Sequence, residues 1–91
     1  LTTEHDPAAA IAGYREALRV APTFVPAHVN LGVTLGMTGQ LEEAALHFAE
    51  AVRLDPKHIA ARQNLALTLR QLGRTEEAAL HFAEAGRLSR R

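Results

Sequence analysis

Apolar residues recur with helical spacing in several stretches of the chain. Leu31 and Leu35 lie four residues apart on one stripe, and Ala44, Phe48 and Ala51 follow the same spacing farther along. Positions three or four residues apart share one face of an α-helix, so each stripe predicts an amphipathic helix. A single helix cannot bury its own stripe. We therefore expect neighbouring helices to pack against one another.

Glycine, proline and charged residues mark where these helices begin and end. Gly39 and Gly73 each follow an apolar stripe, where a residue in the left-handed conformation closes a helix. Asp6 followed by Pro7 is typical of a cap and a first helical turn. Acidic pairs at the predicted starts match the positive end of the helix dipole. Together these markers predict helices over roughly residues 6–20, 26–38, 42–54, 60–72 and 76–90.

The chain also repeats itself at a constant interval. Residues 42–51 recur unchanged as residues 76–85, and the helix before each of them recurs in a similar form. A fainter copy of the second half of the unit precedes them, with Tyr14 at the position of Phe48 and Phe82. The predicted division is half a repeat over residues 1–24 and whole repeats over residues 25–58 and 59–91.

This unit of two helices resembles the tetratricopeptide repeat. The residues that carry the resemblance are Leu31, Gly32, Gly39, Ala44, Phe48, Ala51 and Pro56 in one unit, and Leu65, Ala66, Gly73, Ala78, Phe82 and Ala85 in the next. It implies an all-α fold, a superhelical solenoid of antiparallel hairpins with about five helices. The early tryptophan of the family is replaced by His28 and Arg62, which we expect to change the packing and not the architecture.

The resemblance also implies a concave groove, lined by the first helix of each unit, that takes a peptide or helix of a partner protein. By position, the groove residues are Val29, Asn30, Val33, Met37, Gln63, Asn64, Leu67, Arg70 and Gln71. An amide both donates and accepts, so Asn30 and Asn64 are suited to a peptide backbone whatever its side chains. The alternative is that both asparagines bond within the fold. A clamp for a C-terminal carboxylate is not expected, because Ala60 and Asn64 stand where it needs basic residues.

Composition and spacing argue against other classes of function. The chain has no cysteine, and its ten basic residues balance ten acidic ones, which gives no support for nucleic-acid or membrane binding. No apolar run approaches the ~20 residues that span a bilayer. His47 and His81 lie one whole repeat apart, too far to share a metal ion, and are expected at the surface. We expect no catalysis, no cofactor and no metal.

Three hypotheses of function follow. The first is a scaffold that binds a partner protein in the groove. The second is self-association into a homodimer or larger assembly through uncovered end helices, at Ile11, Tyr14 and Leu18 on one side and Ala79, Phe82 and Gly86 on the other. The third is the accessory array of a larger enzyme, such as a bacterial glycosyltransferase. The sequence leaves the compartment open, with the cytoplasm favoured.

Overall fold

The computed structural model describes residues 6–90 and folds them into five α-helices. They are α1 (Pro7–Val20), α2 (Val25–Met37), α3 (Leu41–Leu54), α4 (Ile59–Gln71) and α5 (Thr75–Ser89). The ends of each helix lie within one residue of those predicted from the sequence. Residues 1–5 and 91, which the predicted division assigns to the first and last units, lie outside the described residues.

The residues predicted to begin and end the helices do so through their backbone conformation and hydrogen bonds. The Asp6 side chain accepts a hydrogen bond from the Ala9 N–H at 3.3 Å, and Pro7 occupies the first helical position of α1. Gly39 and Gly73 adopt positive φ angles of 83° and 85° directly after α2 and α4. A side chain would be strained in that conformation, which explains why glycine closes both helices.

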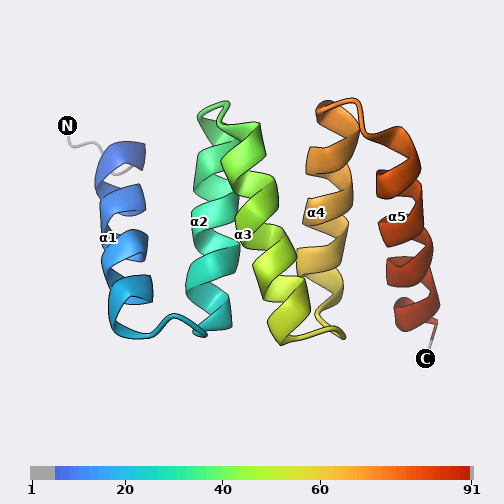
Figure 1. Cartoon of the computed structure of the whole chain (residues 1–91), viewed down its shortest axis with the longest axis horizontal. Coiled ribbons are helices and arrows are strands. Elements are labelled where there is room, and N and C mark those ends of the chain that lie inside the picture. Colours follow the sequence, from blue (N-terminus) through green and yellow to red (C-terminus); the bar gives the residue numbers. More distant parts are fainter. Residues whose placement is uncertain (1–5, 91) are drawn as a thin grey trace.

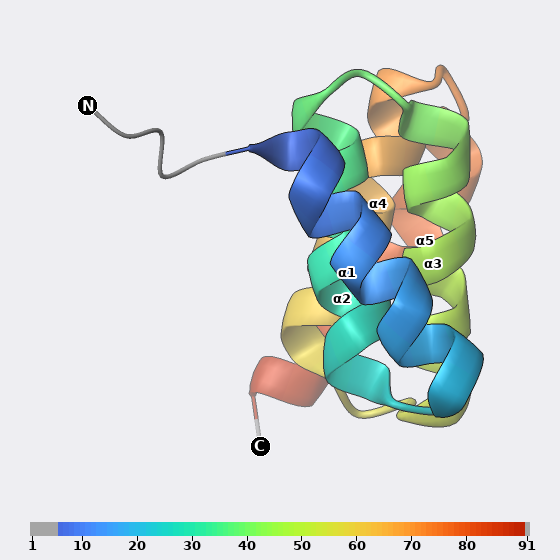
Figure 2. The same cartoon turned by 90° about the vertical axis from the view of Figure 1, so that its left-hand side faces the viewer.

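The helices lie side by side in chain order along the long axis of the molecule (Figure 1). Each helix packs against its neighbours in sequence, and α2 also contacts α4. Seen along the long axis, α2 and α4 lie toward one side and α3 and α5 toward the other (Figure 2). We call these two sides the α2–α4 face and the α3–α5 face. The described fold is an all-α array of stacked hairpins.

The core runs through the middle of the array between these two faces. Leu31, Leu35 and Phe48 are nearly inaccessible, and Leu65 and Leu69 continue the same cluster into the next repeat. Alanines at the helix crossings are also buried, which allows the backbones to approach closely. The matching places of Phe48 and Phe82 on the helical stripes predict that both are core residues. Phe48 is confirmed, because its side chain is 3% exposed, whereas Phe82 is only partly buried.

The two ends of the array differ from what the second hypothesis expected. Ile11, Tyr14 and Leu18 of α1 are partly buried and pack against the core, so they are not an open apolar surface. At the other end, Phe82 is likewise partly buried and packs against the core, Gly86 is half-buried, and Ala79 is exposed. Within residues 6–90, no helix combines the length and the apolar character that crossing a bilayer requires.

Candidate functional site

The α2–α4 face presents the residues predicted to form the groove. Val33, Met37 and Leu67 are exposed apolar side chains, at 39%, 71% and 41%. Asn30, Gln63, Arg70 and Gln71 are exposed as well, whereas Val29 and Asn64 are half-buried. Large apolar side chains that stay exposed beside polar ones are typical of a surface that contacts another molecule.

A hollow of about 290 Å³ lies between α2 and α4 on this face. It brings together Val33, Met37, Asn64, Leu67 and Gln71 from the predicted set. Its other lining residues, which the sequence analysis did not select, are Gly32, Gly36, Phe48 and Thr68. Gly36 lies one turn after Gly32, and a Cβ atom at Gly36 would meet nothing within 4 Å, so the helix surface is open there. The hollow is not lined by Val29, Asn30, Gln63 or Arg70.

A second hollow, of about 520 Å³, lies between α1 and α2. Its lining includes Tyr14 and Ala10 from α1 and Thr34 from α2, and Met37 lines both hollows. The predicted groove residues all belong to the first helices of the two whole repeats. The contribution of α1 was therefore not predicted. Met37 thus links two adjacent hollows.

The two asparagines occupy matching places on α2 and α4. Their backbone carbonyls accept hydrogen bonds from the hydroxyls of Thr34 and Thr68, at 3.0 and 2.8 Å. Neither amide side chain forms a hydrogen bond to another residue in the described part of the chain. Both amides therefore keep their donors and acceptors for other molecules.

The two arginines of α4, Arg70 of the predicted groove and Arg62, differ in their surroundings. Arg70 is exposed, and its guanidinium carbon lies 5.3 Å from the centre of the Phe82 ring, within the range of a cation–π contact. Arg62 is half-buried: it donates a hydrogen bond to the Pro56 carbonyl at 2.9 Å and lies 3.3 Å from Nδ1 of His81. Arg62 is therefore a structural residue of the fold.

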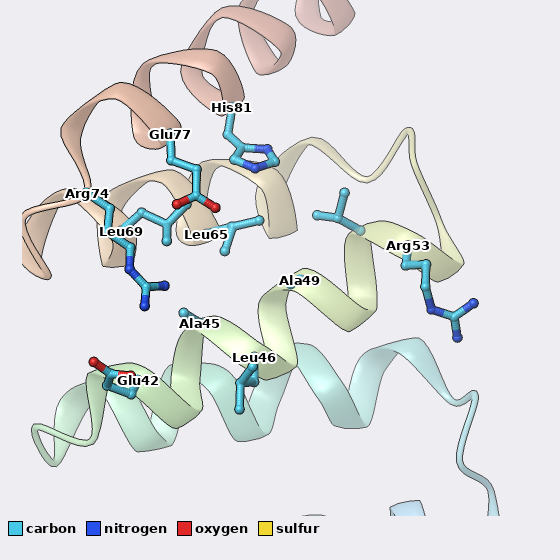
Figure 3. A pocket seen from close by; sticks show the side chains of 11 residues that line it. Glu42, Ala45, Leu46, Ala49, Arg53, Leu65, Leu69, Arg74, Glu77 and His81 are labelled. Carbon is cyan, nitrogen blue, oxygen red and sulfur yellow. The ribbon is translucent and has the colours of Figure 1, made fainter.

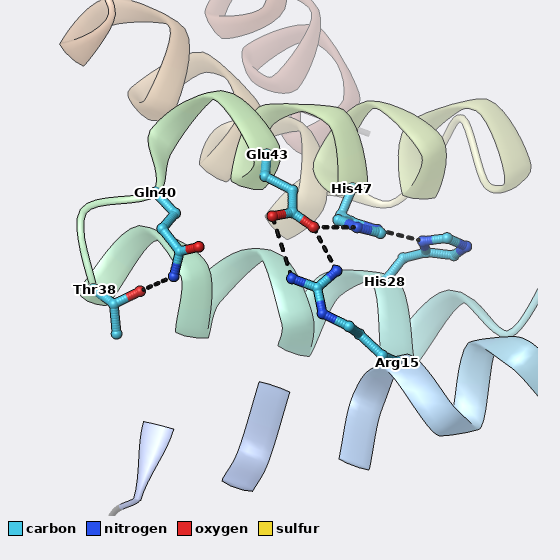
Figure 4. A network of polar contacts seen from close by, with 6 residues as sticks. All are labelled: Arg15, His28, Thr38, Gln40, Glu43 and His47. Carbon is cyan, nitrogen blue, oxygen red and sulfur yellow. Dashed lines mark hydrogen bonds and ion pairs between the residues drawn. The ribbon is translucent and has the colours of Figure 1, made fainter. Parts of the chain in front are cut away.

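His28 and His47 form the corresponding contact in the preceding repeat (Figure 4). Nε2 of His28 lies 2.8 Å from the Pro22 carbonyl, and the Nδ1 atoms of the two rings are 3.1 Å apart. Since His28 donates to Pro22 through Nε2, a neutral His28 accepts from His47 through Nδ1. The expectation that His47 is a plain surface residue is wrong, because its side chain is 21% exposed and joins two helices.

The same network continues to α1 through an ion pair (Figure 4). The Arg15 guanidinium donates to both carboxylate oxygens of Glu43, at 2.5 and 3.2 Å, and Nε2 of His47 lies 3.8 Å from the same carboxylate. The hydrogen bond from Arg15 lowers the pKa of Glu43 below its usual range. Burial, and then the nearby His28, lower the pKa of His47. Burial and the Arg62 charge likewise lower the pKa of His81.

Within residues 6–90, the polar groups do not assemble into a metal centre. Throughout residues 6–90, no three histidine, aspartate or glutamate side chains are grouped so that they could hold a metal ion. The paired glutamates at the start of α3 and α5 lie in the first turn of each helix, where the helix dipole accounts for them.

Comparison with protein families agrees with this geometry. Two family models described as tetratricopeptide repeat match residues 3–59 and residues 37–88. The chain belongs to the tetratricopeptide repeat family. The repeat period, the stacked hairpins and the small residues at the helix crossings are all accounted for by that membership. A comparison with curated proteins found no match.

Solved structures with the same repeat fold include several of MamA. One, of residues 41 to the end of MamA from Desulfovibrio magneticus RS-1, is 27% identical, with a TM-score of 0.88 over 92% of this chain and 48% of that one. A MamA R50E mutant is 31% identical, with a TM-score of 0.79 over 82% of this chain and 55% of that one. The tetratricopeptide array described here thus spans about half the length of these structures.

Proposed function

We propose that this array is a protein-interaction scaffold and that an extended segment of a partner protein lies along its α2–α4 face. The observation that carries the proposal is that exposed Val33, Met37 and Leu67 lie on the same two helices as the unbonded amides of Asn30 and Asn64. Membership of the tetratricopeptide repeat family supports an interaction with protein in general. We propose no catalytic role.

The amides and the apolar side chains have separate tasks in this proposal. Asn30 and Asn64 donate to and accept from the backbone of the bound segment, so they fix its direction and register. The hollow between α2 and α4 receives an apolar side chain of the segment, against Val33 and Leu67. Hydrogen bonds from the two asparagines to the peptide backbone favour an extended conformation of the segment. The preference for particular side chains then depends on the hollows.

A fluorescence titration with a library of labelled peptides tests this function. Replacing both asparagines (Asn30→Ala with Asn64→Ala) should weaken a selected peptide by about 10- to 30-fold, since each neutral hydrogen bond contributes about 1 kcal/mol. Gln40→Ala is the matched control, because it removes an exposed amide from the turn after α2. An affinity that the double substitution leaves unchanged would exclude the asparagine ladder.

Self-association is the second candidate, favoured by one difference between the repeats. Phe48 is 3% exposed, whereas its counterpart Phe82 is half-buried, because no helix within residues 6–90 follows α5 as α4 follows α3. A second copy that covers this end of the array would bury Phe82 and Ala79. The third hypothesis, an accessory array of a larger enzyme, stays a prediction that the full reading frame would test.

A further inference from the structure

A groove of about 430 Å³ lies on the α3–α5 face and is lined by residues of α3, α4 and α5 (Figure 3). Small and apolar side chains of α3 and α4 form its floor, among them Ala45, Ala49, Leu65 and Leu69. Glu77 and His81 of α5 point toward it from the other wall. The groove therefore combines an apolar floor with a carboxylate on one wall.

The preceding repeat shows what occupies the equivalent space there. Arg15 stands one repeat before Ala49, and Glu43 stands one repeat before Glu77. Arg15 reaches from α1 to α3 and pairs with both oxygens of Glu43, at 2.5 and 3.2 Å. The pair lies beside His47, the counterpart of His81. In this repeat the chain itself supplies an arginine to the glutamate.

In the groove between α3 and α5, the side chains at the equivalent positions are shortened. Each of three side chains of α1 is replaced by a smaller one at the equivalent position of α3. The pairs are Ile11 and Ala45, Arg15 and Ala49, and Leu18 and Val52. The space that a long side chain fills between α1 and α3 is therefore open between α3 and α5. The glutamate that would pair with that side chain is retained as Glu77.

Glu77 has no close cationic partner in the described part of the chain. No arginine, lysine or histidine nitrogen of residues 6–90 lies within 4.0 Å of its carboxylate, whereas Glu43 has both Arg15 and His47 within that distance. Arg74 also lines the groove, at the end where Glu42 lies, and it is not within ion-pair distance of either carboxylate. The groove thus offers a carboxylate that Arg74 does not neutralise directly.

We propose that the groove on the α3–α5 face binds an arginine side chain of a partner protein. The aliphatic part of that arginine lies on Ala45, Ala49 and Leu69, and its guanidinium pairs with Glu77 as Arg15 pairs with Glu43. Arginine fits better than lysine, because its planar fork donates two parallel hydrogen bonds to a carboxylate. Its long stem also covers apolar surface while the charge stays near water. This proposal is independent of the one for the α2–α4 face.

A substitution within the chain tests whether the groove accepts arginine. Ala49→Arg restores the arrangement of the preceding repeat, and an ion pair with Glu77 should raise the Tm by about 3–6 °C. Adding Glu77→Gln should abolish this rise, whereas Glu76→Gln, on the same helical turn but outside the groove, should leave it intact. No rise in Tm, or a rise that survives Glu77→Gln, would overturn the proposal.

A binding measurement tests the partner directly. The probe is a library of fluorescein-labelled peptides with one arginine between varied apolar residues, each paired with a twin in which neutral citrulline replaces the arginine. We expect the selected arginine peptides to bind at least about tenfold more tightly than their twins, and Glu77→Gln to remove that difference. Ala49→Arg should block binding, and Glu76→Gln should not affect it.

The outcomes of these binding measurements distinguish peptides that bind the α2–α4 face from peptides that bind the groove on the α3–α5 face. Arginine peptides that bind no better than their citrulline twins, or that bind Ala49→Arg as well as the original chain, would contradict the arginine site. Peptides that lose affinity after Asn30→Ala with Asn64→Ala, but not after Glu77→Gln, bind the α2–α4 face and count against the groove. Arginine peptides with the reverse pattern support it.

Discussion

At the scale of single residues, the packing of Phe48 depends on the small residue opposite it. A Cβ atom at Gly32 would lie 2.7 Å from the nearest atom of the Phe48 ring, so this close approach requires glycine. Glycine at position 32 therefore lets Phe48 enter the core fully.

Gly32→Ala should destabilise the array by about 1–2 kcal/mol, because the buried ring must shift to make room. Gly36→Ala is the matched control in the same helix, since a Cβ there has no neighbour within 4 Å. We expect the control to be neutral or stabilising by up to about 1 kcal/mol, as alanine favours a helix. Urea unfolding measures both. Equal stabilisation by the two substitutions would contradict the close contact with Phe48.

The histidines give the fold a dependence on pH. Folding lowers the pKa of His47 and His81 below the usual value of 6.5, mainly through burial. Below about pH 6.5, the unfolded chain therefore binds more protons than the folded chain does. The free energy of unfolding should decrease as the pH falls through this range. Urea unfolding at pH 7.5 and pH 5.5 measures the decrease. His47→Gln with His81→Gln should flatten it, and an unchanged slope would contradict the role of these residues.

At the scale of the elements, the turn between the two helices of each hairpin depends on how the first helix ends. After α2, the Gln40 N–H bonds to the Leu35 carbonyl at 2.9 Å, and after α4 the Arg74 N–H bonds to Leu69 at 2.8 Å. Both bonds form because Gly39 and Gly73 turn the chain with positive φ. Gln40 and Arg74, which then cap α3 and α5, have nearly the same φ and ψ angles, so the two turns have similar backbone conformations.

Gly39→Ala should lower the free energy of unfolding by about 1 kcal/mol, since only glycine adopts this φ without strain. Gly39→Asn should cost less than alanine, because asparagine tolerates the left-handed conformation better than other residues. Thermal unfolding followed by circular dichroism compares the three chains. An alanine variant as stable as the original would show that the turn relaxes to another conformation.

At the scale of the whole molecule, stability comes from stacking, and the ends of the stack differ. The described residues extend over 41 × 27 × 22 Å, so the array is elongated and each helix is supported mainly by its neighbours in sequence. The α1 end is tied to α3 by the Arg15–Glu43 pair, whereas Ala79 and Phe82 of α5 have no helix beyond them within residues 6–90.

We expect this chain to form a homodimer or larger assembly at high concentration through the α5 end. Light scattering over a range of concentrations measures the assembly. Ala79→Glu should weaken it, because a buried, unpaired carboxylate at the contact is costly. A 9.8 kDa monomer at every concentration would contradict self-association.

Much of this protein follows from the sequence alone. The constant repeat period, the five helices and their ends, the glycine turns and the core position of Phe48 all depend on local signals or on repetition, which can be read along the chain. The family resemblance also predicted a groove on the α2–α4 face, by the positions of the first helices in each repeat.

Only the tertiary structure decided which side chains meet across helices. The Arg15–Glu43 pair, the His28–His47 contact and the position of Arg62 beside His81 join residues 19 to 28 positions apart. Arg15 and His47 resemble ordinary surface residues in the sequence, because their contacts depend on how closely the helices approach and how they cross. The open groove beside Glu77 also depends on the tertiary structure. The small side chain of Ala49 leaves open space only because of how the neighbouring helices are arranged around it.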